Sequence, residues 1–101
     1  MLLFNLDSHA FQIDSIKLYN IITPNGDGKN DVLIIDGLNS NLVTELRVIN
    51  NWGQKVYESK NYTNNWGGTD NRGDRLPAGN YFYLVRTGAN IFKRGLTIIY
   101  E

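Results

Sequence analysis

The segment Thr23–Asp31 constrains the fold of this chain more than any other, because it forces a tight turn. Its sequence, TPNGDGKND, combines two glycines and one proline with two asparagines and two aspartates. Glycine supplies left-handed backbone conformations, and Asn and Asp side chains bond to backbone amides two residues further on. The apolar run Val32–Ile35 follows at once. The segment is therefore an oxygen-rich loop that opens a strand, and its signature residues are Thr23, Pro24, Asn25, Gly26, Asp27, Gly28, Asn30 and Asp31.

Two interpretations of this loop are open. A calcium loop of the EF-hand type places oxygen ligands at alternate positions around an invariant glycine and ends in a bidentate glutamate. With Gly28 as that glycine, the calcium ligands would be Asn25, Asp27, the carbonyl of Lys29 and Asp31. Thr23 and Ile34 then stand where the template needs carboxylates. This mismatch favours the second interpretation, a rigid turn whose Asn and Asp side chains bind backbone amides and whose glycines have positive φ.

Composition bounds the domain count and narrows the function classes. At 101 residues the chain is long enough for one domain, and 42% apolar residues supply its core. The formal net charge is zero, which argues against a nucleic-acid partner, because such domains carry a basic surplus. Positive charge gathers in residues 72–101, which hold five cations and two acidic residues. The chain has no cysteine, which excludes disulfides and thiolate chemistry.

Short apolar runs between turn signals predict strands throughout the chain. The predicted strands cover Ile16–Ile22, Val32–Asp36, Glu45–Asn50, Lys55–Glu58, Tyr81–Val85 and Ile91–Tyr100. Alternation places Leu46 and Val48 on one face of their strand. This pattern predicts an all-β fold, an antiparallel sandwich of about seven strands. Residues 1–14 are interpreted as a leader or upstream linker, and residues 15–101 as the domain.

No catalytic set is recognised in the sequence. The single histidine, His9, lies in the predicted leader and has no acid or nucleophile placed beside it by any motif. No serine stands between the glycines of a nucleophile elbow. We therefore expect the chain not to be an enzyme.

The aromatic residues Trp52, Trp66, Tyr81 and Tyr83 are expected to be structural. Tyr81 and Tyr83 lie two apart on a predicted strand and hence on one face. Trp52 and Trp66 each precede a glycine in a turn, where they can close the ends of the core. The alternative is that the two tryptophans stack on sugars, which would make the chain an adhesion or carbohydrate-binding module.

Five blocks of sequence, in order along the chain, carry a resemblance to a known family. They are residues 23–31, Val48–Tyr57, Trp66–Gly68, Leu76–Tyr83 and Lys93–Gly95. Together they resemble the gliding motility-associated C-terminal domain, also called the type B sorting domain of the type IX secretion system of Bacteroidota. The likeness covers residues 15–101. Asn51 and Gly67 stand where the family often has Arg and Asp.

The resemblance implies an immunoglobulin-like β-sandwich that acts as a non-catalytic secretion signal. Such a domain directs a fused cargo protein through the type IX outer-membrane machinery, including a PorP/SprF-like outer-membrane partner. The cargo reaches the cell surface or the medium. The isolated domain is expected to be a monomer.

Recognition by a receptor is expected at Lys93, Arg94 and Gly95. These residues belong to the last predicted strand, near the end of the chain. An unpaired strand edge can dock by strand addition, with main-chain bonds supplying affinity and the basic pair supplying orientation. A second interpretation stays open, in which the two charges only protect the edge from aggregation.

Overall fold

A computed structural model describes residues 16–39 and 41–100 of the chain. Its strands are β1 (Ile21–Ile22), β2 (Thr44–Ile49), β3 (Lys55–Ser59), β4 (Gly79–Thr87) and β5 (Asn90–Ile98). They form one sheet in the order β1-β5-β4-β2-β3, in which only the β1–β5 pair is parallel. The described residues contain no helix, and so none that could span a membrane. The all-β prediction is confirmed, whereas the predicted leader, with His9, lies outside the described residues.

Strand β4 shows how alternation in the sequence becomes a sheet with two different faces. Tyr81, Tyr83 and Val85 are buried, whereas Phe82 between them is 41% exposed. Strands β2 and β5 are registered so that their own buried residues stand opposite those of β4. Successive side chains of a strand point to opposite faces, so all three strands bury the same side of the sheet. We call the buried side the inner face and the exposed side the outer face.

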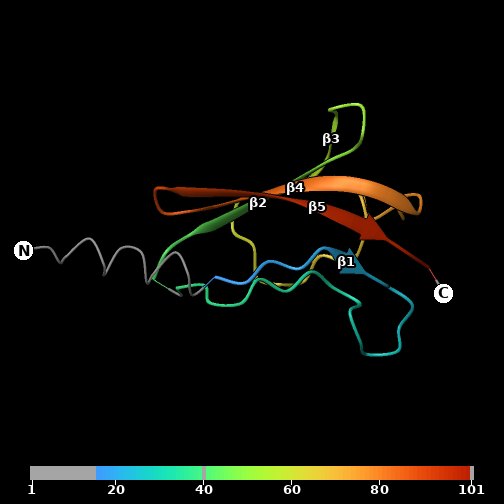
Figure 1. Cartoon of the computed structure of the whole chain (residues 1–101), viewed down its shortest axis with the longest axis horizontal. Coiled ribbons are helices and arrows are strands. Elements are labelled where there is room, and N and C mark those ends of the chain that lie inside the picture. Colours follow the sequence, from blue (N-terminus) through green and yellow to red (C-terminus); the bar gives the residue numbers. More distant parts are fainter. Residues whose placement is uncertain (1–15, 40, 101) are drawn as a thin grey trace, which may run out of the picture.

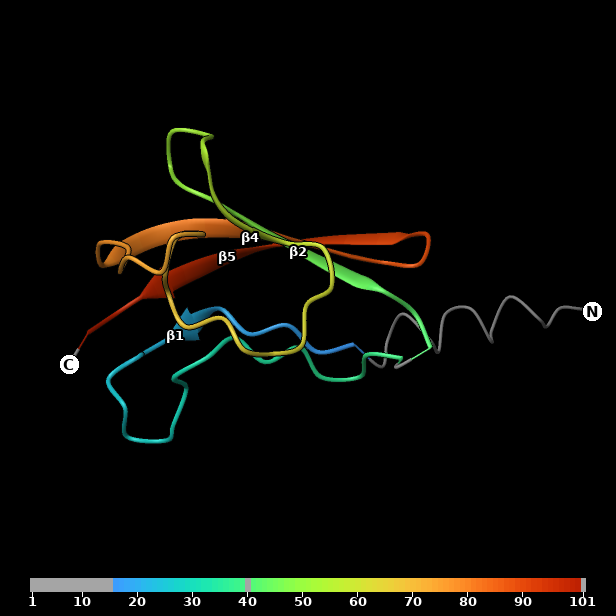
Figure 2. The same ribbon diagram turned by 180° about the vertical axis from the view of Figure 1, so that it is seen from behind.

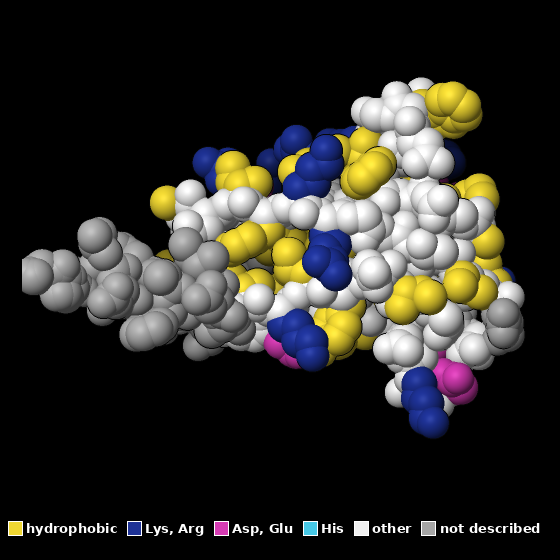
Figure 3. Space-filling model, in the orientation of Figure 1, with side chains coloured by type: hydrophobic (Ala, Val, Ile, Leu, Met, Phe, Trp, Pro, Cys, Tyr) yellow, Lys and Arg dark blue, Asp and Glu magenta, His cyan; other side chains and the backbone are white. Residues whose placement is uncertain are grey.

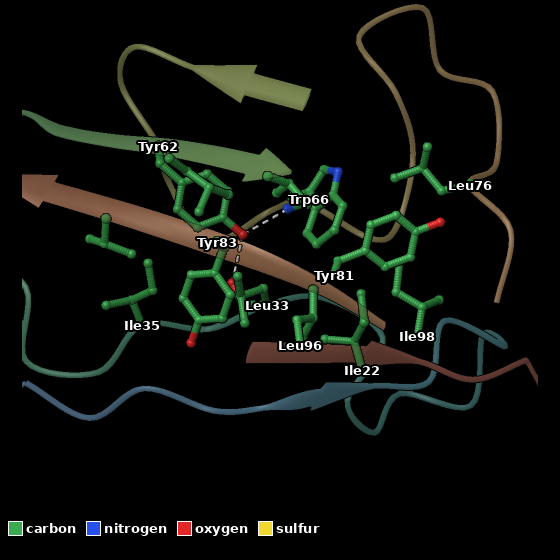
Figure 4. Close-up of a cluster of buried hydrophobic side chains, with 13 residues drawn as sticks. Ile22, Leu33, Ile35, Tyr62, Trp66, Leu76, Tyr81, Tyr83, Leu96 and Ile98 are labelled. Atoms are coloured by element: carbon green, nitrogen blue, oxygen red, sulfur yellow. Dashed lines mark hydrogen bonds between the residues drawn. The ribbon is translucent and has the colours of Figure 1, made fainter. Parts of the chain in front are cut away.

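Irregular segments form a second layer against the inner face. Figure 1 shows β1 and the segments around it beneath β2, β4 and β5, and Figure 2 shows the run near residues 62–69 joining this layer. The hydrophobic core lies between the two layers (Figure 4). Its buried members are Ile22, Leu33, Ile35, Leu46, Val48, Tyr62, Trp66, Leu76, Tyr81, Tyr83, Val85, Leu96 and Ile98.

Residues 32–36 do not form a strand, so the strand predicted there is wrong. Leu33 and Ile35 are buried, as apolar alternation predicts. Their backbone amides, however, bond to partners outside any ladder: Leu33 N–H donates to the Trp66 carbonyl and Ile35 N–H to the Asn64 side chain. The strand predicted at residues 16–22 is likewise reduced to β1. The described residues thus form one sheet against an irregular layer, where two sheets were predicted.

Hydroxyl groups of buried and half-buried tyrosines tie the layers and loops together through main-chain carbonyls. Burial raises the pKa of Tyr83 to about 12 and also raises the pKa of Tyr62, so both hydroxyls stay protonated and can donate. The bonds of this kind, which we call the tyrosine clips, run from Tyr62 to Leu33, from Tyr83 to Tyr19, from Tyr81 to Pro77 and from Tyr100 to Leu76.

Candidate functional site

Strand β5 has one edge that is only partly paired. It pairs with β4 along its whole length, but with β1 only near its C-terminal end. There the Thr97 N–H donates to the Asn20 carbonyl at 2.9 Å. At the preceding residue, the carbonyl of Tyr19 accepts a hydrogen bond from the hydroxyl group of Tyr83. The Tyr83 side chain extends from the inner face of the sheet, so the chain at Tyr19 no longer runs along the edge of β5. Within the described part of the chain, no strand pairs with this edge at residues 91–95.

The residues expected to contact a receptor, Lys93, Arg94 and Gly95, lie on this open edge and are exposed. Gly95 stands opposite Phe82, which places Lys93 and Gly95 on the outer face and Arg94 on the other side. The Lys93 Nζ atom lies 5.1 Å from the centroid of the Phe82 ring, within cation–π range. A Cβ atom at Gly95 would meet nothing within 4 Å, so the space beside this residue is open.

A groove of about 700 Å³ passes over this edge and the adjoining outer face. Its walls include Lys93, Arg94, Gly95 and Thr97 of β5, Asn80 and Phe82 of β4, and Asn20 and Asn51 from the flanking segments. In the part of the molecule that is described, no salt bridge involves Lys93, Arg94 or Arg86. Figure 3 shows Lys and Arg side chains interleaved with hydrophobic ones over the sheet. The groove therefore combines exposed positive charge, apolar surface and main-chain groups with which no described strand pairs.

Asp31 organises the signature loop, a role that the sequence analysis did not assign to it. One carboxylate oxygen accepts the N–H groups of Asn25 at 3.1 Å and Gly26 at 2.9 Å. The other accepts the N–H of Gly28 at 2.7 Å. These bonds, and that of Gly28 above all, hold the pKa of Asp31 below its usual range. The sequence did contain a signal for this role, because Asp31 follows two glycines that can turn the backbone toward its carboxylate.

The other acidic and amide side chains of the loop make the Asx turns that the turn interpretation predicts. Asn25 Oδ1 accepts the N–H of Asp27 at 3.1 Å, and Asp27 Oδ1 accepts the N–H of Lys29 at 2.8 Å. Gly26 and Gly28 have φ angles of 81° and 82°. Oxygens that a calcium ion would use are therefore engaged by amides. The described residues contain no group of three or more His, Cys, Asp or Glu that could hold a metal ion, and calcium binding stays a prediction.

The two tryptophans occupy opposite environments. Trp66 is 2% exposed, and its indole N–H donates to the Thr69 carbonyl at 2.7 Å. Trp52 is 85% exposed, so the prediction that it closes an end of the core is wrong. The reason lies in Asn50, whose side-chain oxygen accepts the N–H groups of both Trp52 and Gln54 at 2.9 Å. These bonds close a turn that carries the indole away from the core.

The fold and the groove together define an all-β domain with a basic, partly unpaired strand edge in its described part. Residues 16–99 match the CHU_C type IX secretion signal domain family, and the chain belongs to that family. The match confirms the resemblance carried by the sequence blocks. The domain is thus a non-catalytic sorting signal for type IX secretion, which exports proteins to the cell surface or the extracellular space. No curated protein matches the chain.

Proposed function

We propose that the secretion machinery reads this domain as a folded object, through the groove at Lys93, Arg94 and Gly95. Cargo sequences differ from protein to protein, so recognition has to use the surface of the signal domain itself. The exposure of these residues and their place on a sheet support the proposal. In this scheme the direct partner is a PorP/SprF-like outer-membrane protein, and the fused cargo follows the domain to the surface or the medium.

We also infer that the fold is a variant of the immunoglobulin-like sandwich that the resemblance implies. The irregular layer would then take the place of the second sheet. Its support is the position of the core, which lies between the sheet and this layer as it does between two sheets.

Sufficiency for export tests the proposed function. A fluorescent protein directed to the periplasm of a type IX-competent host would carry residues 1–101 at its C-terminus, and a second fusion would carry residues 15–101. We expect both reporters to be exported. Retention of the first in the periplasm, while an established type B domain exports the same reporter, would contradict the proposal. Export of the first alone would place the boundary of the domain before residue 15.

The exposure of Trp52 favours a second candidate function, an adhesion or carbohydrate-binding module. An indole that is 85% exposed on a turn held by Asn50 is available for stacking on a sugar ring. The Trp52→Ala variant separates the candidates. Export that continues with loss of glycan binding in an array assay would assign Trp52 to adhesion, and lost export would assign it to sorting.

A further inference from the structure

We propose that the open edge of β5 receives an extended, acidic segment of the secretion machinery, which adds to the sheet as a further strand. The inference rests on the proposed function and specifies how the groove is used. Strand addition derives its affinity from main-chain hydrogen bonds and its specificity from alternate side chains. The edge has to offer unpaired main-chain groups, room for a strand and a matching charge.

The bond of Thr97 shows which main-chain groups of β5 point toward the open edge. Its N–H points away from β4, toward Asn20. Main-chain groups of a strand alternate between its two sides, so Ile91, Lys93 and Gly95 point their N–H and C=O groups the same way. No described strand reaches these residues on that side. They form a continuous row of donors and acceptors beside the groove.

The opposite edge of the sheet carries a side-chain cap at Glu58 of β3. There the Asn71 side chain binds both main-chain groups of one residue of β3, as a neighbouring strand would. Its Oδ1 accepts the N–H of Glu58 at 2.9 Å, and its Nδ2 donates to the carbonyl of Glu58 at 2.9 Å. Capping of this kind blocks edge-to-edge pairing. Along residues 91–95 of β5, the described structure contains no such side-chain cap.

The distribution of charge makes the partner segment acidic. Near β3, Arg47, Lys55 and Lys60 all form salt bridges with Glu58. Lys93 and Arg94 have no such carboxylate in the described structure, so an acidic strand would supply the missing counter-charge. Exposed apolar side chains, Phe82 at 41% and Ile91 at 63%, adjoin the same edge. We therefore expect acidic residues to alternate with apolar ones in the partner.

Proline at residue 95 tests the main-chain part of the inference. Gly95→Pro removes an N–H that points away from β4, and proline is tolerated at such edge positions. Gly95→Ala is the matched control, because it keeps the N–H and its Cβ enters open space. Each change is made in the full 101-residue chain fused to the periplasmic reporter. We expect export to fall about tenfold or more for proline, as for the loss of one good hydrogen bond, and to fall less for alanine than for proline, because alanine keeps the main-chain N–H.

Charge reversal tests the acidic character of the partner. Lys93→Glu keeps a charge on the edge and so still protects it from aggregation, but it repels an acidic strand. Arg72→Glu is the control, on a turn of the β3–β4 connection. We expect export to fall with Lys93→Glu and to persist with Arg72→Glu. Equal export of both would overturn the inference in favour of simple edge protection.

The remaining outcomes are also decisive. A folded Gly95→Pro domain, shown by an unchanged melting curve, that is exported like wild type would overturn strand addition. If proline lowers the melting temperature markedly, the Lys93→Glu result decides alone. Failure of the wild-type fusion would overturn the proposed function and this inference together, whereas wild-type export with insensitive variants would overturn this inference and the assignment of the groove but not the sorting function.

Discussion

The hydroxyl group of Tyr62 donates a 2.6 Å hydrogen bond to the main-chain carbonyl of Leu33, 29 residues earlier in the chain. The same hydroxyl accepts the N–H of Trp66 at 3.0 Å (Figure 4). One buried oxygen atom thus joins the irregular layer to the segment that carries the largest core side chain. Its position makes it the most informative single atom to remove.

Tyr62→Phe is expected to destabilise the domain by about 1–3 kcal/mol, because it leaves a buried carbonyl and a buried N–H unpaired. For a domain of this size, each kcal/mol lowers the melting temperature by roughly 4–8 °C. Thermal melts followed by circular dichroism measure the change. Tyr19→Phe is the control, since its hydroxyl bonds to Asp36 at the surface, and we expect a change within about 0.5 kcal/mol. Equal losses in both variants would contradict the assigned role.

The two tryptophans should respond oppositely to truncation. Trp66→Ala is expected to cost about 3–5 kcal/mol, as for other buried aromatic residues. Trp52→Ala is expected to change stability by about 0.5 kcal/mol or less, because the indole lies outside the core. Acrylamide quenching supplies a second measurement, in which the emission of Trp52 is quenched and that of Trp66 is protected. A large loss of stability in Trp52→Ala would show that its turn matters to the fold.

Calcium is expected to leave the melting temperature unchanged, because the loop oxygens already bind amides. A ligand that binds only the folded state raises stability by mass action, so a real site would be visible in the melt. Wild type and Asp27→Asn are compared in millimolar calcium and in chelator. The asparagine can still accept the Lys29 N–H, so both proteins should melt alike under both conditions. A shift of several degrees confined to wild type would establish the calcium site.

Acid should weaken the domain in part through Glu58. Hydrogen bonds and ion pairs from Lys55 first, and then Arg47, lower the pKa of Glu58 from 4.5 to about 2. A carboxyl group with a lowered folded-state pKa stabilises the fold above its unfolded pKa, and this contribution is lost as pH falls through the folded value. Melting temperatures should therefore drop between about pH 4.5 and 2, and less steeply for Glu58→Gln. Identical slopes for the two proteins would exclude Glu58 as a contributor.

Alkaline pH should weaken the domain through Tyr83. Burial raises its pKa from 10.0 to about 12, so the unfolded chain loses this proton before the folded chain does. The corresponding stability is complete below pH 10 and declines between about pH 10 and 12. Denaturant titrations across this range should show a shallower decline for Tyr83→Phe, although that variant starts from lower stability. A decline that is unchanged in Tyr83→Phe would assign the effect to other groups.

The sheet was largely predictable because its strands carry a period-two pattern. Strands β2 to β5 appear close to their expected positions, with Leu46 and Val48 buried together. Residues 32–36 carry the same kind of apolar pattern but form no ladder. The main-chain N–H groups of Ile35 and Leu33 bond to Asn64 and Trp66 instead. A local sequence pattern cannot predict such contacts, because the two segments are about thirty residues apart.

The candidate site was predictable only in its residue types. The sequence places a basic pair on the last strand, but the openness of that edge depends on the turn of the chain away from β5 before Asn20. The exposure of Trp52 depends similarly on the side-chain bonds of Asn50. A Trp-Gly pair marks a turn, and the direction of the turn is set by contacts that lie outside the pair.

The tyrosine clips have a consequence for where and when the domain can mature. The clips of Tyr62, Tyr83 and Tyr100 tie segments 24 to 64 residues apart without a covalent bond, in a chain that has no cysteine. Such bonds form without an oxidant, a thiol isomerase or a particular redox potential. The same fold is therefore accessible in a reducing cytoplasm and in an oxidising periplasm. A signal held together in this way can be presented for export as soon as its chain has folded.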